Sequence, residues 1–300
     1  MSIRPRPTPD VTLVFHPQQD VSYVHFLDGD AHPFDPAKGR LGRRNAWWLA
    51  DAALLSYWAP DEARERYGRV GFDVEPFFGG TTQCYLAWND QAVIVTFRGT
   101  EPGEPGDILD DLTFAVAPWD RHGQFVHLGF KIALDRVWPM LSNRLSGLSP
   151  SRSVWFAGHS LGAALAVLAA DRYGDATAGV CTLGGPRVGD MHFAASHSAR
   201  FGARSLRYVN DADVVTHLPP PVPYKHGGAG RFIDSKGHVS SVRPTLHHYF
   251  AMLVGDPGHI KEIRLGLDQG HLHRPPDFLL DHMPRAYAVD IWNDYARFGD

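Results

Sequence analysis

The chain has 300 residues, of which 44% are hydrophobic, and this is enough for a large core in a single α/β domain. Its 29 lysines and arginines against 33 aspartates and glutamates give a formal net charge of -4, so the basic surplus typical of a nucleic-acid-binding protein is absent. The two cysteines, Cys84 and Cys181, lie in apolar runs, which predicts buried free thiols rather than a disulfide framework.

The first 40 residues are rich in Pro, Asp and His and show little periodicity. The first 20 contain four prolines and lack the apolar core of a signal peptide. No apolar run in the chain approaches the ~20 residues of a membrane span. We therefore expect a cytoplasmic protein whose residues 1–300 form one domain, with residues 1–40 as an N-terminal extension that wraps the core. Short strands or extended chain are expected over 11–15 and 21–26.

The next segments alternate between helical and strand patterns. Apolar residues at helical spacing predict a helix over 45–58, and Asp61 is expected to cap a short second helix. Residues 82–88 and 92–97 predict two strands of a hairpin. The second strand ends in Phe97-Arg98-Gly99-Thr100, and a loop rich in Pro and Gly follows. Within it, residues 107–112 are either a small flap over a site or a solvated turn.

The second half of the chain predicts a parallel sheet. A helix is expected over 129–145, where Pro139 should kink or divide it. From Ser153 onward the pattern is strand, helix, strand, helix, strand, which is typical of parallel strands with helices on both faces of the sheet.

One turn in this region carries the candidate nucleophile. A β-branched and aromatic run leads into Gly158-His159-Ser160-Leu161-Gly162, and a small apolar helical run follows. Glycines two residues on either side of Ser160 allow a strand to turn at once into a helix, so that the serine hydroxyl projects from a strained turn, the nucleophile elbow. Leu161 is then the first helical residue, and its free backbone N–H is a candidate oxyanion donor. The alternative is a glycine-rich turn with an idle serine.

A serine hydroxyl needs a base, and the base needs an acid that fixes its tautomer. In this architecture the order is serine, acid, histidine. The acid is expected after the strand 205–209, where both Asp211 and Asp213 fit by spacing, and the two valines after Asp213 suggest the more enclosed position. His282 lies on a loop just before a helix that begins near Pro284, which suits a positioned base. A surface histidine near a helix start is the alternative.

The remaining candidates are weaker. Thr100 lies where a second oxyanion donor is needed, or it merely begins a loop. Of the other histidines, most are expected to be bystanders: His217 is interpreted as structural, His226 lies in a glycine-rich loop, and His247 and His248 are expected to pack in an apolar helical pattern. His271-x-His273 could bind a metal by its spacing, but no cysteine and no clear carboxylate completes a site. We expect no metal and no cofactor.

Several ordered motifs together resemble the fungal-type (class 3) triacylglycerol lipases, from about residue 45 to the C-terminus. The segments that carry the resemblance are Phe97-Arg98-Gly99-Thr100, Asp111-Leu112, residues 126–130, Gly158-His159-Ser160-Leu161-Gly162, residues 185–189, residues 209–220, and Asp281-His282 with Tyr287. The resemblance selects Asp213 over Asp211. It implies an α/β-hydrolase-type fold with a mostly parallel central sheet and a short lid, and hydrolysis of lipid esters without a cofactor. The sequence departs from the family at three points. Ala163 replaces a usual glycine, and the disulfides of secreted fungal members are absent. The lid stretch is acidic, which predicts weak interfacial activation.

The sequence therefore predicts a serine ester hydrolase with Ser160, Asp213 and His282 as catalytic residues and Thr100 and Leu161 as the oxyanion hole. The substrate is a lipid or other ester, at a lipid interface in the lipase interpretation. The other interpretations are a short-chain carboxylesterase, a phospholipase A1-like esterase, a peptidase or acyltransferase on the same scaffold, and a lipase-like binding module that has lost turnover.

Overall fold

The computed structural model describes residues 1–8, 10–37, 39–100, 115–148, 151–241 and 280–300. The expected flap over 107–112, the lid stretch that contains it and the histidines at 247, 248, 271 and 273 lie outside these residues. In the part of the chain that is described, no helix combines the length and the apolar character needed to cross a membrane.

An eight-stranded sheet forms the centre of the molecule, in the order β1-β2-β3-β6-β7-β9-β11-β12. The strands are β1 (Asp73–Gly79), β2 (Thr82–Trp88), β3 (Ala92–Phe97), β6 (Ser153–His159), β7 (Thr177–Leu183), β9 (Ser205–Asn210), β11 (Ala229–Ile233) and β12 (Val239–Ser240). From β3 to β11 neighbouring strands run parallel, and the hairpin β1-β2-β3 and the edge strand β12 are antiparallel. Every residue of β6 and β7 is buried, because both faces of these strands are covered.

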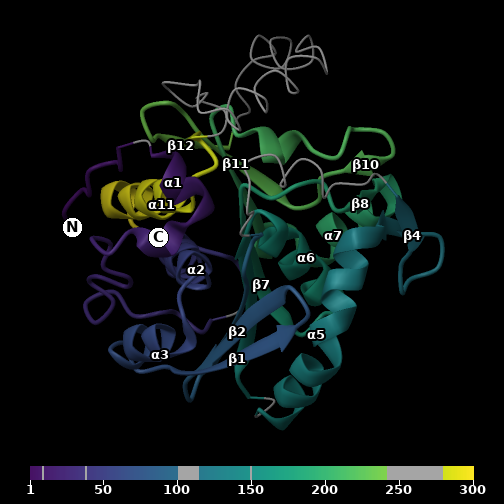
Figure 1. Cartoon of the computed structure of the whole chain (residues 1–300), viewed down its shortest axis with the longest axis horizontal. Helices are drawn as coiled ribbons and strands as arrows, with labels where there is room; N and C mark the ends of the chain where they lie inside the picture. The colour runs from purple at the N-terminus through teal and green to yellow at the C-terminus, as the bar shows by residue number, and fades with distance from the viewer. Residues whose placement is uncertain (9, 38, 101–114, 149–150, 242–279) are drawn as a thin grey trace.

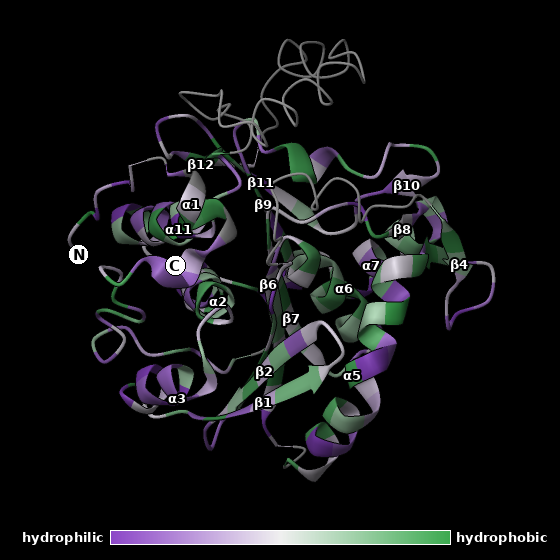
Figure 2. Cartoon of the chain, viewed as in Figure 1, coloured by the Kyte–Doolittle hydropathy of each residue, from purple (hydrophilic) through white to green (hydrophobic). Residues whose placement is uncertain are grey.

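Helices cover both faces of this sheet (Figure 1). On one face lie α2 (Arg43–Leu55), α3 (Pro60–Gly68) and α11 (Pro284–Phe298), and on the other lie α5 (Leu128–Gly147), α6 (Leu161–Tyr173) and α7 (Met191–Phe201). Apolar residues line the sheet and the helix faces toward it, which gives one hydrophobic core on each side (Figure 2). The predicted α/β-hydrolase-type architecture is confirmed, and the buried, free Cys84 and Cys181 agree with the predicted thiols.

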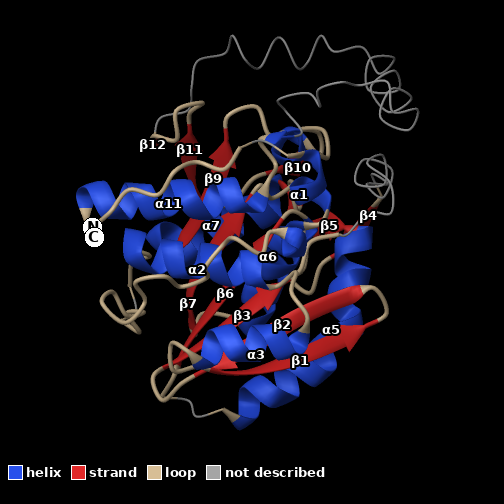
Figure 3. Ribbon diagram, turned by 60° about the vertical axis from the view of Figure 1, so that its left-hand side comes forward, coloured by secondary structure: helices blue, strands red, loops and turns tan. Residues whose placement is uncertain are grey.

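A second, four-stranded antiparallel sheet lies beside α5 and α7 (Figure 3). Its strands, in spatial order, are β10 (Tyr224–Lys225), β8 (Gly189–Asp190), β5 (Phe125–His127) and β4 (Val116–Pro118). Short helical segments complete the structure, namely α1 (Val11–Phe15), η1 (Pro17–Gln19), η2 (Gly202–Arg204) and η3 (Val214–His217).

Several local expectations were wrong. Residues 11–15 form α1 instead of a strand, because the Asp10 side chain accepts a hydrogen bond from the Thr12 N–H and caps a helical turn. Residues 21–26 form turns. Ala59, not Asp61, is the N-cap residue of α3, since Pro60 occupies its first position. Pro139 does not divide α5, which is continuous through it.

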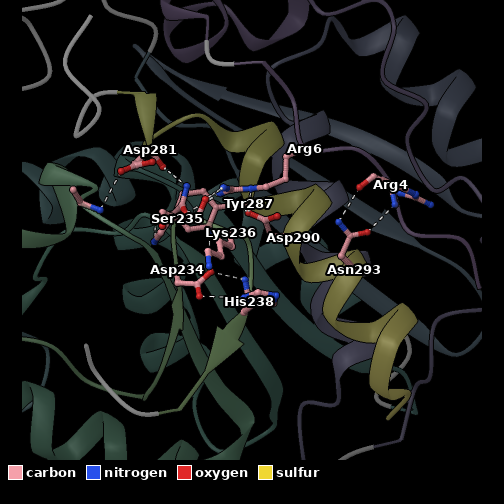
Figure 4. A network of polar contacts seen from close by, with 12 residues as sticks. Arg4, Arg6, Asp234, Ser235, Lys236, His238, Asp281, Tyr287, Asp290 and Asn293 are labelled. Atoms are coloured by element: carbon pink, nitrogen blue, oxygen red, sulfur yellow. Dashed lines mark hydrogen bonds and ion pairs between the residues drawn. The ribbon is translucent and has the colours of Figure 1, made fainter. Parts of the chain in front are cut away.

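The N-terminal segment packs along α11, the helix that follows His282 (Figure 4). The Arg4 N–H donates to Asn293 Oδ1 over 2.8 Å, and the Arg4 guanidinium lies 3.9 Å from the centre of the Trp292 ring. Arg6 forms an ion pair of 2.8 Å with Asp290 and also donates to the Ser235 carbonyl in the turn between β11 and β12. The N-terminal segment therefore ties α11 to the far edge of the sheet.

A buried carboxyl group joins the same segment to α2. Asp51 is fully buried and accepts hydrogen bonds from Tyr23 Oη over 2.5 Å and from the Phe26 N–H over 2.6 Å. Burial raises the pKa of Asp51 to about 6. Between pH 4 and pH 6 the native state therefore holds more protons than the unfolded chain, so this group makes the free energy of unfolding fall as pH rises through that window.

We expect Asp51→Asn to remove this pH dependence. We measure how far the free energy of urea unfolding falls between pH 4 and pH 6. This fall should be smaller in the variant than in the wild type, by up to about 3 kcal/mol, since one pKa unit corresponds to about 1.4 kcal/mol. Asp61→Asn, at an exposed carboxyl on α3, is the matched control and should leave the slope unchanged. If the free energy of unfolding of Asp51→Asn depends on pH as that of the wild type does, Asp51 has the same pKa in the folded and the unfolded chain.

Candidate active site

The elbow forms where the sequence predicts it. Strand β6 ends at His159, α6 begins at Leu161, and Ser160 between them has φ 57° and ψ −128°, a strained conformation for a residue with a side chain. A Cβ added at Gly158 would lie 2.2 Å from the Gly162 carbonyl oxygen, and one added at Gly162 would lie 2.0 Å from the Phe97 carbonyl oxygen. Both glycines are therefore required by the close approach of backbones at this corner.

The departure at Ala163 has a structural explanation. A Cβ added at Gly185 would lie 2.7 Å from the Ala163 Cβ, so the missing side chain of Gly185 leaves the space that the alanine methyl group fills. The extra methyl group is accommodated without disturbing the turn.

Both expected oxyanion donors lie next to Ser160. Thr100, Ser160 and Leu161 line one cavity of about 260 Å³. The end of β3 passes so close to the elbow that a Cβ at Gly99 would lie 3.2 Å from the Ser160 Cβ. Ser160 makes no side-chain capping bond to α6, so the N–H groups of the first helical turn are not satisfied by that side chain. These positions are compatible with the oxyanion donors that the sequence predicts.

Asp213 is fully buried at the exit of β9 and is the acid that the structure brings to His282. His282 Nδ1 lies 2.9 Å from Asp213 Oδ2 and 3.0 Å from Asp213 Oδ1. The Val215 N–H donates to Oδ1 over 3.0 Å, and the Tyr287 hydroxyl donates to Oδ2 over 2.6 Å. Asp211 instead bonds through its backbone N–H to Ile233 and is partly exposed. The choice of Asp213 over Asp211 thus agrees with the geometry.

The ring of His282 lies beside the elbow. It is 1% exposed, and its centre is 4.4 Å from that of His159, the residue before Ser160. Gly184 lies against the ring, with its ideal Cβ position 3.0 Å from His282 Nδ1, and the Ser160 N–H donates to the adjacent Leu183 carbonyl over 3.0 Å. Among the described residues, His282 Nε2 has no hydrogen-bond partner, so it is available to a hydroxyl proton.

Three further bonds hold the acid loop against the turn that carries His282, and the sequence did not reveal them. Asn210 Nδ2 donates to the Asp281 carbonyl over 2.9 Å, and the Ala212 N–H donates to Asp281 Oδ2 over 3.1 Å. The Asn210 N–H donates to the Tyr287 hydroxyl over 2.9 Å. Burial raises the pKa of Asp281 to about 7. The only signal in the sequence was the resemblance at Tyr287.

His159 fixes the main chain of His282. Its Nε2 lies 2.8 Å from the His282 carbonyl oxygen, and its Nδ1 lies 2.9 Å from Tyr57 Oη. Because a carbonyl can only accept, Nε2 carries the proton and Nδ1 accepts from the tyrosine hydroxyl. Burial, with a smaller effect from His282, lowers the pKa of His159 well below its usual value, so its ring is neutral. His159, next to Ser160, therefore holds the main chain of His282 in place and adds no charge to the site.

We expect Tyr287→Phe to impair turnover without unfolding the protein. The variant removes a donor from Asp213 and leaves the buried Asn210 N–H without its acceptor, so the acid should hold His282 less firmly. A lost bond to a charged group predicts a fall in kcat of roughly 10-fold for a nitrophenyl ester, with KM little changed. Tyr295→Phe on the same helix, whose hydroxyl contacts His32, is the matched control and should keep kcat. An unaltered kcat in Tyr287→Phe would remove Tyr287 from the positioning of Asp213.

Of the other histidines considered in the sequence, His217 and His226 lie in the described residues. His226 Nε2 lies 2.7 Å from the Thr216 carbonyl oxygen, and burial lowers the pKa of this histidine. The carbonyl of His217 accepts from the buried Arg187, which also donates to the Pro219 carbonyl over 2.5 Å. These contacts pack the chain after the acid loop against the exit of β7. In the described ranges, no group of three His, Cys, Asp or Glu side chains is placed to hold a metal ion.

Comparison with known proteins finds similarity to lipases and to a phospholipase. Residues 94–222 match the family model described as lipase (class 3). A lipase of Rhizopus niveus is 28% identical over 205 residues, which cover 64% of this chain and 49% of the relative. A chloroplastic phospholipase A(1) of Arabidopsis thaliana is 30% identical over 191 residues, which cover 58% of this chain and 40% of the relative.

The fold has solved counterparts. The structure of a Rhizomucor miehei lipase propeptide complex superposes with a TM-score of 0.54 at 26% identity, covering 64% of this chain and 68% of that one. The chain spans less than half the length of the curated relatives that it matches. The segment that matches the class 3 lipase model begins in β3 and extends past Asp213. It therefore contains Thr100, Ser160 and Leu161 but not His282.

Proposed function

We propose that this chain is a member of the class 3 lipase family and a serine ester hydrolase that cleaves carboxylic esters of lipids through an acyl-enzyme on Ser160. The observation that carries the proposal is the buried pair of Asp213 and His282, hydrogen bonded over 2.9 Å, beside a serine on a nucleophile elbow. A serine hydroxyl becomes a nucleophile when such a base takes its proton.

Each residue has a defined role in this mechanism. Ser160 Oγ attacks the acyl carbonyl while His282 Nε2 accepts the hydroxyl proton. Asp213 holds the Nδ1–H of His282 and stabilises the imidazolium that forms. The backbone N–H of Leu161 and a donor on Thr100 bind the oxyanion. His282 then gives the proton to the leaving alcohol, and water resolves the acyl-enzyme by the same steps in reverse.

The preferred substrate in this proposal is a triacylglycerol, because the motifs of the sequence resemble those of triacylglycerol lipases and the Rhizopus relative is a lipase. The similarity to a phospholipase A(1) supports a phospholipase-like esterase as the second candidate. A short-chain carboxylesterase shares the same machinery. We further propose that residues 1–300 act as one domain, because the N-terminal segment bonds to α11 and α2. The cytoplasmic location stays a prediction.

The test is hydrolysis of nitrophenyl esters from acetate to palmitate, of emulsified triacylglycerol and of phosphatidylcholine, by wild type beside Ser160→Ala. We expect turnover of long-chain esters and of triacylglycerol by the wild type alone. A sharp fall beyond short acyl chains would assign a carboxylesterase, and preferential release of one fatty acid from phosphatidylcholine would assign the phospholipase. Absence of turnover on every ester would favour a binding module and overturn the proposal.

A further inference from the structure

The cavity that contains Ser160 extends along α5 to the hairpin turn between β1 and β2. The α5 residues that line it recur every three or four positions, which places them on one face of the helix, and they are Gly129, Phe130, Ile132, Ala133 and Arg136. From Gly129 to Arg136 this face rises about 10 Å, since each residue adds 1.5 Å. At the far end the cavity is lined by Arg136 and Thr81.

The sheet gives an independent measure of the same length. Thr82 begins β2, and β2 is separated from β6 by β3 alone, so the turn at Thr81 lies about 10 Å along the sheet edge from Ser160 at a spacing of about 4.8 Å per strand. The register places both at the same edge, because Cys84 pairs with Phe97 and Phe97 pairs with Gly158. Arg136 therefore lies at one end of the groove, about 10 Å from Ser160.

Arg136 differs from the other cations of its helix. Lys131 pairs with Asp135 over 2.8 Å, and Arg144 pairs with Glu75 over 2.7 Å. Arg136 forms no ion pair with any residue in the described ranges, and its Nη1 lies 3.4 Å from the ideal Cβ position of Gly80. The guanidinium thus rests against a glycine turn, beside the exposed Thr81, with its charge unpaired by the described chain.

The chemistry of the proposed reaction decides which part of a substrate occupies this groove. His282 gives its proton to the leaving alcohol, so the alcohol lies on the His282 side of Ser160. His282 does not line the cavity, whereas both proposed oxyanion donors do. The acyl chain consequently extends from Ser160 along the groove. Between Ser160 and Arg136 the groove is lined by the apolar α5 residues Phe130, Ile132 and Ala133.

We propose that Arg136 is a specificity-determining residue that binds a carboxylate at the far end of the acyl chain. Besides plain fatty acyl groups, the site then accepts a medium-length dicarboxylic acid esterified at one end, and hydrolysis releases the free diacid and the alcohol. An apolar groove that ends at an unpaired guanidinium is complementary to such a chain, since arginine matches the planar fork of a carboxylate. This inference rests on the proposed esterase activity and adds the class of acyl group.

The test compares two esters of equal chain length, the nitrophenyl monoester of octanedioic acid and nitrophenyl octanoate. Arg136→Gln should lower kcat/KM for the monoester about tenfold, the range of a charge-assisted hydrogen bond at an open site, and leave octanoate unchanged. Arg136→Lys should restore part of the loss, and added salt should reduce the wild-type preference. Arg144→Gln on the same helix is the matched control and should alter neither ester.

The failures of the two proposals are distinguishable. Hydrolysis of octanoate by the wild type with equal effects of Arg136→Gln on both esters, or with none, would overturn the role of Arg136 and leave the esterase intact. If phosphatidylglycerol is assayed in parallel, a loss in Arg136→Gln that is confined to this anionic phospholipid would assign the guanidinium to a headgroup and overturn the acyl-end position. No hydrolysis of either ester by the wild type would overturn both proposals.

Discussion

Ser160→Ala should lower kcat for a nitrophenyl ester by about 10⁴-fold or more, because no other group in this mechanism can form the acyl-enzyme. Ser160 is 4% exposed, and its side chain makes no capping bond to α6, so loss of the hydroxyl should leave the fold intact. The measurement is steady-state hydrolysis, with circular dichroism to confirm folding.

Two further variants sharpen this result. Ser198→Ala, at an exposed serine on α7 whose hydroxyl bonds to the Ala194 carbonyl, is the control and should retain full activity. Adding His282→Ala to Ser160→Ala should cost little more than either change alone, since residues that act as a unit are not additive. Residual activity of Ser160→Ala within tenfold of the wild type would contradict an acyl-enzyme on Ser160.

Gly162→Ala should be the most destabilising conservative change in the described chain. The added Cβ would lie 2.0 Å from the Phe97 carbonyl oxygen and 2.9 Å from the Arg98 carbonyl carbon, so α6 or the end of β3 must move. Overpacking a buried backbone contact costs about 3 kcal/mol or more, and here it also displaces the oxyanion donors. We expect loss of soluble folded protein, or a large fall in melting temperature with loss of activity.

The matched control for this change is Gly68→Ala, in α3, where an added Cβ meets nothing within 4 Å. Replacing a helical glycine by alanine in open space should be neutral or stabilise the fold by up to about 1 kcal/mol. Equal thermal stability of Gly162→Ala and the wild type would show that the elbow tolerates a side chain where this structure leaves no room.

Local patterns in the sequence were enough to predict the centre of the fold. Strands β2 and β3 have the bounds that their alternating and apolar runs predicted, and the elbow follows β6 as the glycines around Ser160 required. These elements are buried on both faces and end at turns with strong steric demands, so their signals are local. Thr100, Ser160 and Asp213 likewise lie at or just after the ends of such strands, where a local pattern could single them out.

Other elements depend on contacts that a local pattern does not carry. Strand β1 contains Pro76 and lies at the sheet edge, and β11 begins with Ala229-Gly230, so neither resembles a buried strand in sequence. The distinction between Asp211 and Asp213 was likewise left open by spacing. It depends on bonds from His282 and Tyr287, which lie about 70 residues further along the chain.

The central claim is that His282 and Asp213 activate the hydroxyl of Ser160. Its most direct test is peptide mapping after a fluorophosphonate, which reacts with activated serines, is added to the folded protein. The account predicts one adduct, on Ser160, which forms far more slowly in His282→Gln and not at all after unfolding. An unlabelled Ser160 in the folded wild type, or equal labelling in His282→Gln, would contradict it.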